Sequence, residues 1–150
     1  MRPHSLYVPF VFLLLGFSSM MAQQALPFST VTGFFEAFHK KDSATLRTFF
    51  DPRAQLTFTS TDATGIPSKR HLSVSEFVER ISERPDKPEW EERLGAPVVE
   101  SHENLATVWV PFSFYIDNNL SHSGHNLFQL FWNGSQWKIL TIADTRTYSP

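Results

Sequence analysis

Residues 105–147, the last third of the chain, are rich in the aromatic and β-branched residues that favour β-strands. Three aromatic-rich segments are separated there by two turn-forming stretches, Asn118-Asn119 and Asn133-Gly134-Ser135. The pattern predicts a three-stranded antiparallel meander. Its strands are apolar on both faces, so another part of the chain must cover one of those faces.

Helical periodicity comes before the meander. The first predicted helix carries an apolar face at the i, i+3, i+4, i+7 spacing, formed by Val31, Phe34, Phe35 and Phe38. Ser29 or Thr30 is expected to cap its start. A short second helix is predicted at residues 44–50, where Asp51-Pro52 ends it.

A hairpin and a third helix follow. Residues 54–58 alternate as a half-buried strand does, and residues 69–72 are expected to return beside them. Ser73 and Glu76 have the spacing of a capping box and begin a third amphipathic helix that reaches Ile81.

Residues 89–102 form a long strand candidate that Gly95 and Pro97 interrupt. This interruption predicts a bulge or a bend that curves the sheet. Helices come first and antiparallel strands last, so the predicted fold class is α+β. We expect a curved antiparallel sheet wrapped over the N-terminal helices, as a cone with a pocket at its open end.

The turns set the strand register, and the register decides which side chains share a face. A two-residue turn at Asn118-Asn119 pairs Tyr115 with His122 and Trp109 with Phe128, while a turn at Gly134-Ser135 pairs Phe128 with Thr141. The predicted inner face therefore consists of Trp109, Tyr115, His122, Asn126, Phe128, Leu130, Trp137, Ile139 and Thr141. The predicted outer face consists of Val108, Val110, Phe112, Phe114, His125, Leu127, Phe131, Leu140, Ile142, Asp144 and Arg146. A turn at Asn133-Gly134 is the alternative, and it swaps the faces of the last strand.

His122 and Tyr115 are the best candidates for catalytic chemistry. A histidine near neutral pKa can act as an acid or a base, and a tyrosine hydroxyl can hold a substrate oxygen. The alternative is a histidine that a hydroxyl satisfies near the end of the sheet. The predicted ligand-binding residues are Trp109, Asn126, Phe128, Phe34, Phe38 and Trp137, although the aromatic ones would equally suit a plain hydrophobic core.

Other polar residues suggest less. His125 and Asp144 are predicted to face each other on the outer face, as an acid–base dyad or as an interface salt bridge that also involves Arg146. His122 and His125 are three residues apart on one strand, so they point to opposite faces and cannot easily chelate one ion. We expect no metal site and no cofactor. Lys69-Arg70-His71 is predicted to be a solvated edge.

The bulk composition narrows the class of protein. The chain has 150 residues, of which 41% are hydrophobic and 19% charged, which is typical of one globular domain. It has no cysteine, which excludes disulfides, thiolate metal sites and cysteine nucleophiles. A formal net charge of −2 without a long basic run argues against nucleic acid as a partner.

The N-terminus has the pattern of a secretory signal peptide. Arg2 precedes an apolar run over residues 6–17, and small residues follow before Gln23. We expect residues 1–22 to be the signal peptide and residues 23–150 to be a single domain. The mature protein would then be secreted or periplasmic and without a stable membrane anchor. An uncleaved anchor is the alternative, although the apolar run is short for a membrane span.

Two segments resemble a known superfamily. FFEAFHKKDSATLRTFFD, residues 34–51, is similar to the two-helix opening of the nuclear-transport-factor-2-like (NTF2-like) superfamily. Residues 114–146, FYIDNNLSHSGHNLFQLFWNGSQWKILTIADTR, resemble its closing meander, especially in secreted bacterial proteins of the SnoaL-like or lumazine-binding-like type. The superfamily contains ketosteroid isomerases, dehydratases, epoxide hydrolases and many non-enzymes, so the fold does not settle the function. Because its members commonly dimerise through the sheet, the resemblance implies a homodimer.

The leading functional hypothesis is a secreted domain that binds a small, mostly apolar molecule in the cone pocket. One alternative is a small enzyme of the dehydratase or isomerase type that uses His122 and Tyr115. Ketosteroid isomerase chemistry itself is disfavoured, because the predicted inner face has no clear carboxylate. The other alternative is a non-catalytic interaction module that uses the outer face of the sheet.

Overall fold

The computed structural model describes the backbone of residues 17–62 and 64–148, and the side chains from residue 27 on. The helices are α1 (Phe17–His39), α2 (Ser43–Phe49) and α3 (Val74–Ser82). The strands are β1 (Phe50–Thr61), β2 (Pro67–Leu72), β3 (Trp90–Leu94), β4 (Val98–His102), β5 (Leu105–Ile116), β6 (Asn119–Trp132) and β7 (Trp137–Tyr148). Most of the predicted signal peptide, residues 1–22, lies outside the described residues.

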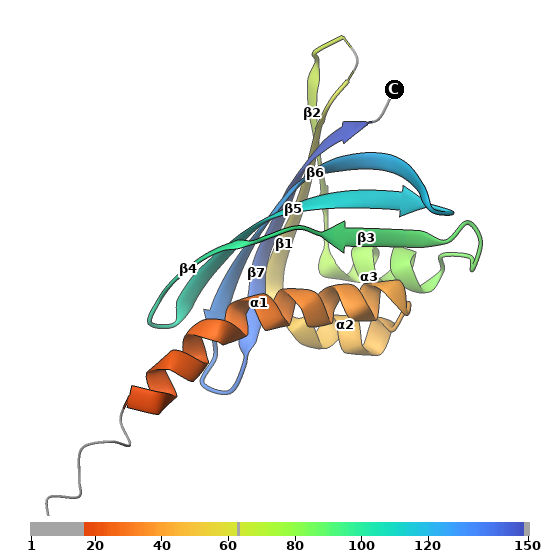
Figure 1. Cartoon of the computed structure of the whole chain (residues 1–150). Coiled ribbons are helices and arrows are strands. Elements are labelled where there is room, and N and C mark those ends of the chain that lie inside the picture. Colours follow the sequence, from red (N-terminus) through yellow and green to blue (C-terminus); the bar gives the residue numbers. More distant parts are fainter. Residues whose placement is uncertain (1–16, 63, 149–150) are drawn as a thin grey trace, which may run out of the picture.

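The strands form one curved sheet in the order β2-β1-β7-β6-β5-β3. β4 pairs with the same edge of β5 as β3 does, nearer the start of β5. β1 and β7 run parallel, whereas the other neighbouring strands are antiparallel. Figure 1 shows the sheet curving over α1, with α2 and α3 beside that helix. The expected α+β cone, with a curved sheet over N-terminal helices, is confirmed.

The helix ends follow local sequence signals. At α3 the predicted capping box is confirmed, since the Glu76 N–H donates to Ser73 Oγ at 3.2 Å and the Ser73 N–H donates to Glu76 Oε2 at 2.8 Å. Asp42 caps α2 by accepting from the Thr45 N–H. The expected start of the first helix is wrong, because α1 begins at Phe17 and contains Pro27. The missing proline N–H removes one hydrogen bond without ending the helix.

The predicted bend within residues 89–102 is confirmed, and it divides the segment into β3 and β4. Leu94 pairs with Phe112 and Val98 with Trp109, so three residues on this edge stand opposite two on β5. A Cβ on Gly95 would lie 2.7 Å from the ring of Pro111. Glycine therefore permits the close approach at the point where the strand is bulged.

The predicted register of the β5–β6 hairpin is wrong by one residue. The turn is formed by Asp117 and Asn118, which both have positive φ, +48° and +63°. Aspartate and asparagine tolerate this conformation better than most residues, which suits the tight turn. A bulge at Ser121 follows, so that Phe114 rather than Tyr115 faces His122.

This correction reverses the faces of β5. Its even-numbered residues from Ala106 to Phe114 are buried on the concave side, and Val108 rather than Trp109 pairs with Phe128. Trp109 and Tyr115 therefore lie on the outer face of the sheet.

The last hairpin agrees with the expected register only near its turn. Trp132 pairs with Trp137 and Leu130 with Ile139, as a turn centred on Gly134-Ser135 predicts. One extra residue in β7, Leu140, then forms a bulge, and Phe128 pairs with Ile142 instead of Thr141. Beyond the bulge the faces of β7 are exchanged, so Ile142 and Asp144 are buried on the concave side.

The core lies between the concave face and the helices. Phe34 is 2% exposed and has edge-to-face contacts with Phe35, Phe50 and Phe128. Its ring also stacks on that of Phe77 from α3 at 6.0 Å. These aromatic contacts fix α1 and α3 against the sheet and define the walls of the space between them.

Candidate functional site

A cavity of about 390 Å³ opens between α1, α3 and the concave face of the sheet. We call it the cone cavity. Most of its lining is apolar. Aromatic side chains come from α1, α3 and five of the strands: Phe34, Phe35, Phe38, Phe58, Phe77, Trp90, Phe112, Phe114, Phe128 and Tyr148. The abundant phenylalanine of the sequence therefore does not fill the cone completely.

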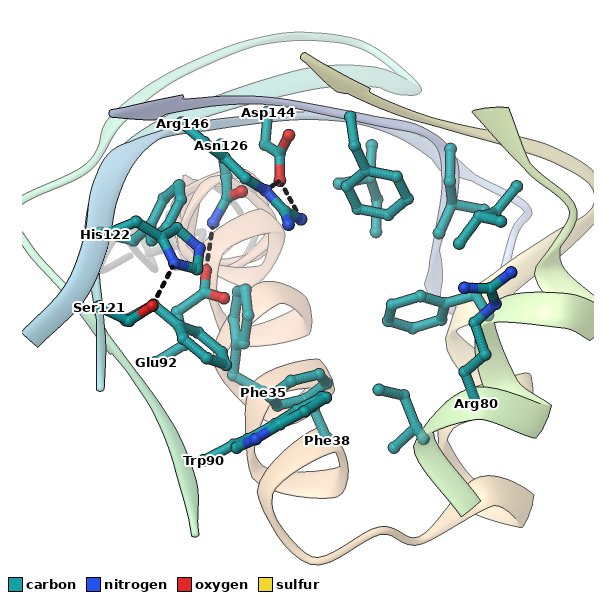
Figure 2. A pocket seen from close by; sticks show the side chains of 18 of the residues that line it. Phe35, Phe38, Arg80, Trp90, Glu92, Ser121, His122, Asn126, Asp144 and Arg146 are labelled. Carbon is teal, nitrogen blue, oxygen red and sulfur yellow. Dashed lines mark hydrogen bonds and ion pairs between the residues drawn. The ribbon is translucent and has the colours of Figure 1, made fainter. Parts of the chain in front are cut away.

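One side of the cone cavity is polar. This polar wall consists of Glu92 from β3, Ser121, His122 and Asn126 from β6, and Asp144 and Arg146 from β7. Figure 2 shows these side chains converging from β3, β6 and β7, with Glu92 below Asn126. The bulges at Ser121 and Leu140 place the β6 and β7 members on the same face.

Glu92 is the most perturbed acid of the polar wall. Asn126 Nδ2 donates a hydrogen bond of 2.6 Å to Glu92 Oε1. Burial raises the pKa of Glu92 from 4.5 to about 7, although the hydrogen bond from Asn126 works in the opposite direction. A carboxyl group with this pKa exchanges its proton near neutral pH, as acid–base catalysis requires.

The backbone of Glu92 is held by α1. Its N–H donates to His39 Nε2 at 2.9 Å, so this nitrogen of His39 must be unprotonated. Burial lowers the pKa of His39, which favours the neutral ring that can accept this bond. The contact connects the C-terminal turn of α1 to the strand that carries the acid.

Asp144 and Arg146 form an ion pair in the wall. Arg146 donates from Nε at 2.9 Å and from Nη2 at 2.8 Å to Asp144 Oδ2, and the Thr59 N–H reaches Oδ1 at 3.2 Å. Burial raises the pKa of Asp144, whereas Arg146 and the Thr59 N–H oppose this shift. The two charge-assisted hydrogen bonds to one carboxylate oxygen fix the guanidinium group at the cavity surface.

His122 is held as a neutral ring. It is 8% exposed, stacks on Phe114 with ring centres 4.8 Å apart, and has its Nδ1 3.1 Å from Ser121 Oγ. Burial lowers the pKa of His122 to about 4, and the charge of Arg146 adds to the effect. At neutral pH the ring can offer one donor and one acceptor, but it is not a cation.

The structure brings together five of the eight predicted site residues. His122, Asn126, Phe34, Phe38 and Phe128 all line the cone cavity. The predicted pair of His122 with Tyr115 is wrong, because the Tyr115 ring lies on the outer face with the guanidinium of Arg93 4.0 Å from its centre.

The other two predicted aromatic ligands also lie elsewhere. Trp109 is 42% exposed on the outer face and stacks on His125 at 4.9 Å. Trp137 is buried but packs against Trp132 and does not line the cavity. The predicted contact of His125 with Asp144 is wrong as well, since Asn126 faces Asp144 and His125 faces Thr145.

Sequence reasoning missed the carboxylates of the inner face. The expectation that this face has none is wrong, because Glu92 and Asp144 both reach the cavity. Within residues 90–94, strand alternation places Glu92 on one face and Glu91 and Arg93 on the other, but it does not say which face points inward. Arg70 was also missed, since the predicted solvated edge at residues 69–71 is exposed but Arg70 additionally lines the cavity.

The described part of the chain lacks two other features, a cluster of metal ligands and a membrane-spanning helix. No three histidine, cysteine, aspartate or glutamate side chains gather there in a way that could hold a metal ion. In the same part of the chain, no helix combines the length and the apolar character that crossing a membrane requires.

The comparisons with known proteins bear on the fold of this chain. No protein-family model matches the sequence, and no curated protein matches it either. Among solved structures, an NTF2-like protein with a cystatin-like fold from Novosphingobium aromaticivorans superposes with a TM-score of 0.67 at 8% identity, covering 90% of each chain.

Two further structures are similar to the same extent. A candidate dehydratase of the NTF2-like family from Streptomyces avermitilis gives a TM-score of 0.60 at 11% identity, covering 87% of this chain and 99% of that one. An NTF2-like protein of unknown function from Shewanella baltica gives 0.58 at 12% identity, with 91% and 100% covered. At these identities the likeness establishes the fold, and the chain has an NTF2-like fold.

Proposed function

We propose that this protein binds a small, mostly apolar molecule that carries a hydrogen-bonding group. The observation that supports this most directly is a cavity of about 390 Å³ with aromatic walls and one polar side. Small-molecule sites have volumes of roughly 300–1,000 Å³ and combine apolar walls with a few fixed polar groups. In this chain Glu92, Asn126 and His122 supply those groups, while Phe34, Phe38 and Phe128 receive the apolar body.

The proposal is tested by blocking the cavity. Ile116 lines it, whereas Tyr115, the next residue on β5, lies on the outer face. We expect Ile116→Trp to lose small molecules that co-purify with the wild-type protein and Tyr115→Trp to retain them, as measured by mass spectrometry of the extracted protein. Equal retention in both variants would place the ligand outside the cavity and reject the proposal.

A second candidate function is proton transfer of the isomerase or dehydratase kind. It is favoured by Glu92, whose pKa of about 7 suits a general acid or base, and by the neutral His122 in the same wall. In such a step the Glu92 carboxylate takes a proton from a carbon next to a carbonyl group. The electron pair of the C–H bond forms a C=C bond, and the π pair of the carbonyl group moves onto its oxygen, to which His122 can hydrogen-bond.

Deuterium exchange measures this step without knowledge of the natural substrate. With 2-tetralone in heavy water, we expect the wild-type protein to speed exchange at the carbon next to the carbonyl, and Glu92→Gln to abolish the effect. Glu91→Gln is the control, because Glu91 pairs with Arg93 at the surface. If the wild-type protein exchanges the ketone no faster than buffer does, or if the Glu92→Gln variant exchanges it equally fast, proton transfer by Glu92 is ruled out.

The proposed binding protein is an exported one. Support comes from the charged, apolar and small-residue regions within residues 1–22. Mass spectrometry of the protein secreted by an expressing cell should give a chain that begins at Gln23, and a full-length chain in the cell would contradict export.

A third role, protein interaction through the outer face, is favoured by the exposed Trp109.

A further inference from the structure

We propose that the ligand of the cone cavity is a mostly apolar acid, in its simplest form a carboxylate, whose anionic group lies between Arg70 and Arg80. This inference rests on the proposed binding function and specifies the chemistry of the ligand. Arg70 on β2 and Arg80 on α3 both line the cavity and are both exposed. They therefore stand where the cavity meets solvent, and we call them the arginine rim.

Figure 2 shows Arg80 across the cavity from Glu92 and His122. The Arg80 end of the rim and the polar wall are thus two polar regions on opposite sides of the cavity, and Arg70 stands nearer the wall, beside the Phe58 ring that Arg146 also contacts. A molecule that reaches both must have an apolar body with a polar group at each end, one at the arginine rim and one at the polar wall.

Positive charge converges on one side of the opening. The guanidinium groups of Arg70 and Arg146 lie 5.4 and 5.0 Å from the centre of the same ring, that of Phe58. Each contact is a cation–π interaction, and together they hold two cations at one aromatic side chain. Because both guanidinium groups lie close to one ring centre, an anion bound beside that ring would be attracted to both.

The carboxylates of the cavity neutralise only part of this charge, although the charge of Arg70 also acts on Asp144. Asp144 is engaged by Arg146 through two hydrogen bonds. Burial gives Glu92 a pKa of about 7, so it carries only part of a negative charge at neutral pH. Within the described part of the chain, neither Arg70 nor Arg80 forms a salt bridge. A cleft with cations at its opening and low-polarity walls attracts anions.

The preference for an anion over a neutral molecule of the same shape is expected to be modest, because both arginines of the rim are exposed. Exposed ion pairs contribute roughly 0.2–1 kcal/mol each, so two arginines together amount to about a tenfold preference for an anion. The apolar body supplies most of the remaining affinity, and a neutral molecule of the same shape should therefore still bind, but more weakly.

The test compares 2-naphthoate with its neutral counterpart 2-naphthamide by isothermal titration. We expect the wild-type protein to bind naphthoate about tenfold more tightly than the amide. The double variant Arg70→Gln, Arg80→Gln should lose this preference and keep its affinity for the amide. The control is Lys69→Gln, Arg53→Gln, which removes the same charge from exposed positions outside the cavity lining and should keep the preference.

The outcomes separate this inference from the function on which it rests. If naphthoate and naphthamide bind equally to the wild-type protein, the acid preference is wrong and the binding function stands. An equal loss of preference in both double variants would assign it to net charge and not to the rim, which also overturns the inference. If neither molecule binds, the proposed function fails and the inference fails with it.

Discussion

Two neighbouring residues of the polar wall illustrate how burial acts on acids and bases in opposite directions. Burial raises the pKa of Glu92 to about 7 and lowers the pKa of His122 to about 4, because an apolar environment disfavours the charged form of either group. Both are consequently held nearer to neutrality than in water. This makes the wall a set of hydrogen-bonding groups whose principal fixed charges are those of Asp144 and Arg146.

The two shifts predict opposite contributions to the pH dependence of stability. Between pH 4.5 and about 7, folded Glu92 retains a proton that the unfolded chain has lost, so rising pH weakens folding. Between about pH 4 and 6.5, unfolded His122 holds a proton that the folded ring lacks, so rising pH strengthens folding. Each effect is on the order of 3 kcal/mol.

Single variants separate these contributions in urea unfolding at pH 4.5 to 7. Relative to wild type, Glu92→Gln should gain stability as pH rises, because only the His122 effect remains. His122→Asn should lose stability over the same range, because only the Glu92 effect remains. Parallel pH profiles for wild type and both variants would show that neither group is shifted by the wall.

At the scale of elements, single-residue bulges control the site. The extra residues Ser121 and Leu140 each move a strand by one position, and the segment around Gly95 bends the edge strand. Because side chains alternate with a period of two, each such step exchanges inner and outer residues. In β7 the bulge at Leu140 turns the side chain of Asp144 into the cavity.

The close contact of β6 with β7 at Gly124 predicts a sensitive position. A Cβ on Gly124 would lie 1.8 Å from the carbonyl oxygen of Thr145 and 3.1 Å from the ring of Phe112. Gly124→Ala must therefore push β7 away next to Asp144 and Arg146. We expect a loss of about 3 kcal/mol in the free energy of unfolding, measured in urea.

Ser123→Ala is the matched control for this change. Ser123 is the preceding residue of β6, its side chain points to the other face, and its loss should alter stability by no more than about 0.5 kcal/mol. A Gly124→Ala protein as stable as the control would mean that the strands separate there without cost.

At the scale of the whole molecule, the outer face of the sheet remains apolar and exposed. Val98, Leu105 and Trp109 are 58%, 52% and 42% exposed on β4 and β5. Adjacent exposed apolar side chains of this size are typical of surfaces that meet another protein. The homodimer that the resemblance implies stays a prediction, and this face is where it would form.

Sedimentation measures the predicted dimer directly. We expect wild-type protein to sediment as a dimer and Trp109→Glu to shift the population toward monomer, because it places a charge in the apolar contact. Ile66→Glu is the control, since Ile66 is 63% exposed between β1 and β2. A wild-type monomer at all concentrations would contradict the dimer, and equal dissociation in both variants would place the contact elsewhere.

The features that could be predicted from the sequence are those that depend on near neighbours in the chain. The order of helices and strands, the apolar stripe of α1, the capping box at Ser73 and the bend around Gly95 each follow from spacings within a few residues. The α+β cone follows in turn from the order of these elements.

The side chains that meet in the cavity could not be predicted from the sequence. One-residue bulges are weakly encoded locally, yet each one exchanges the faces of a strand, which is why Tyr115 and Trp109 were predicted inward and lie outward. The pKa of Glu92 has the same origin at longer range. It is raised because β3, β6 and α1, distant in the chain, together remove one carboxyl group from water.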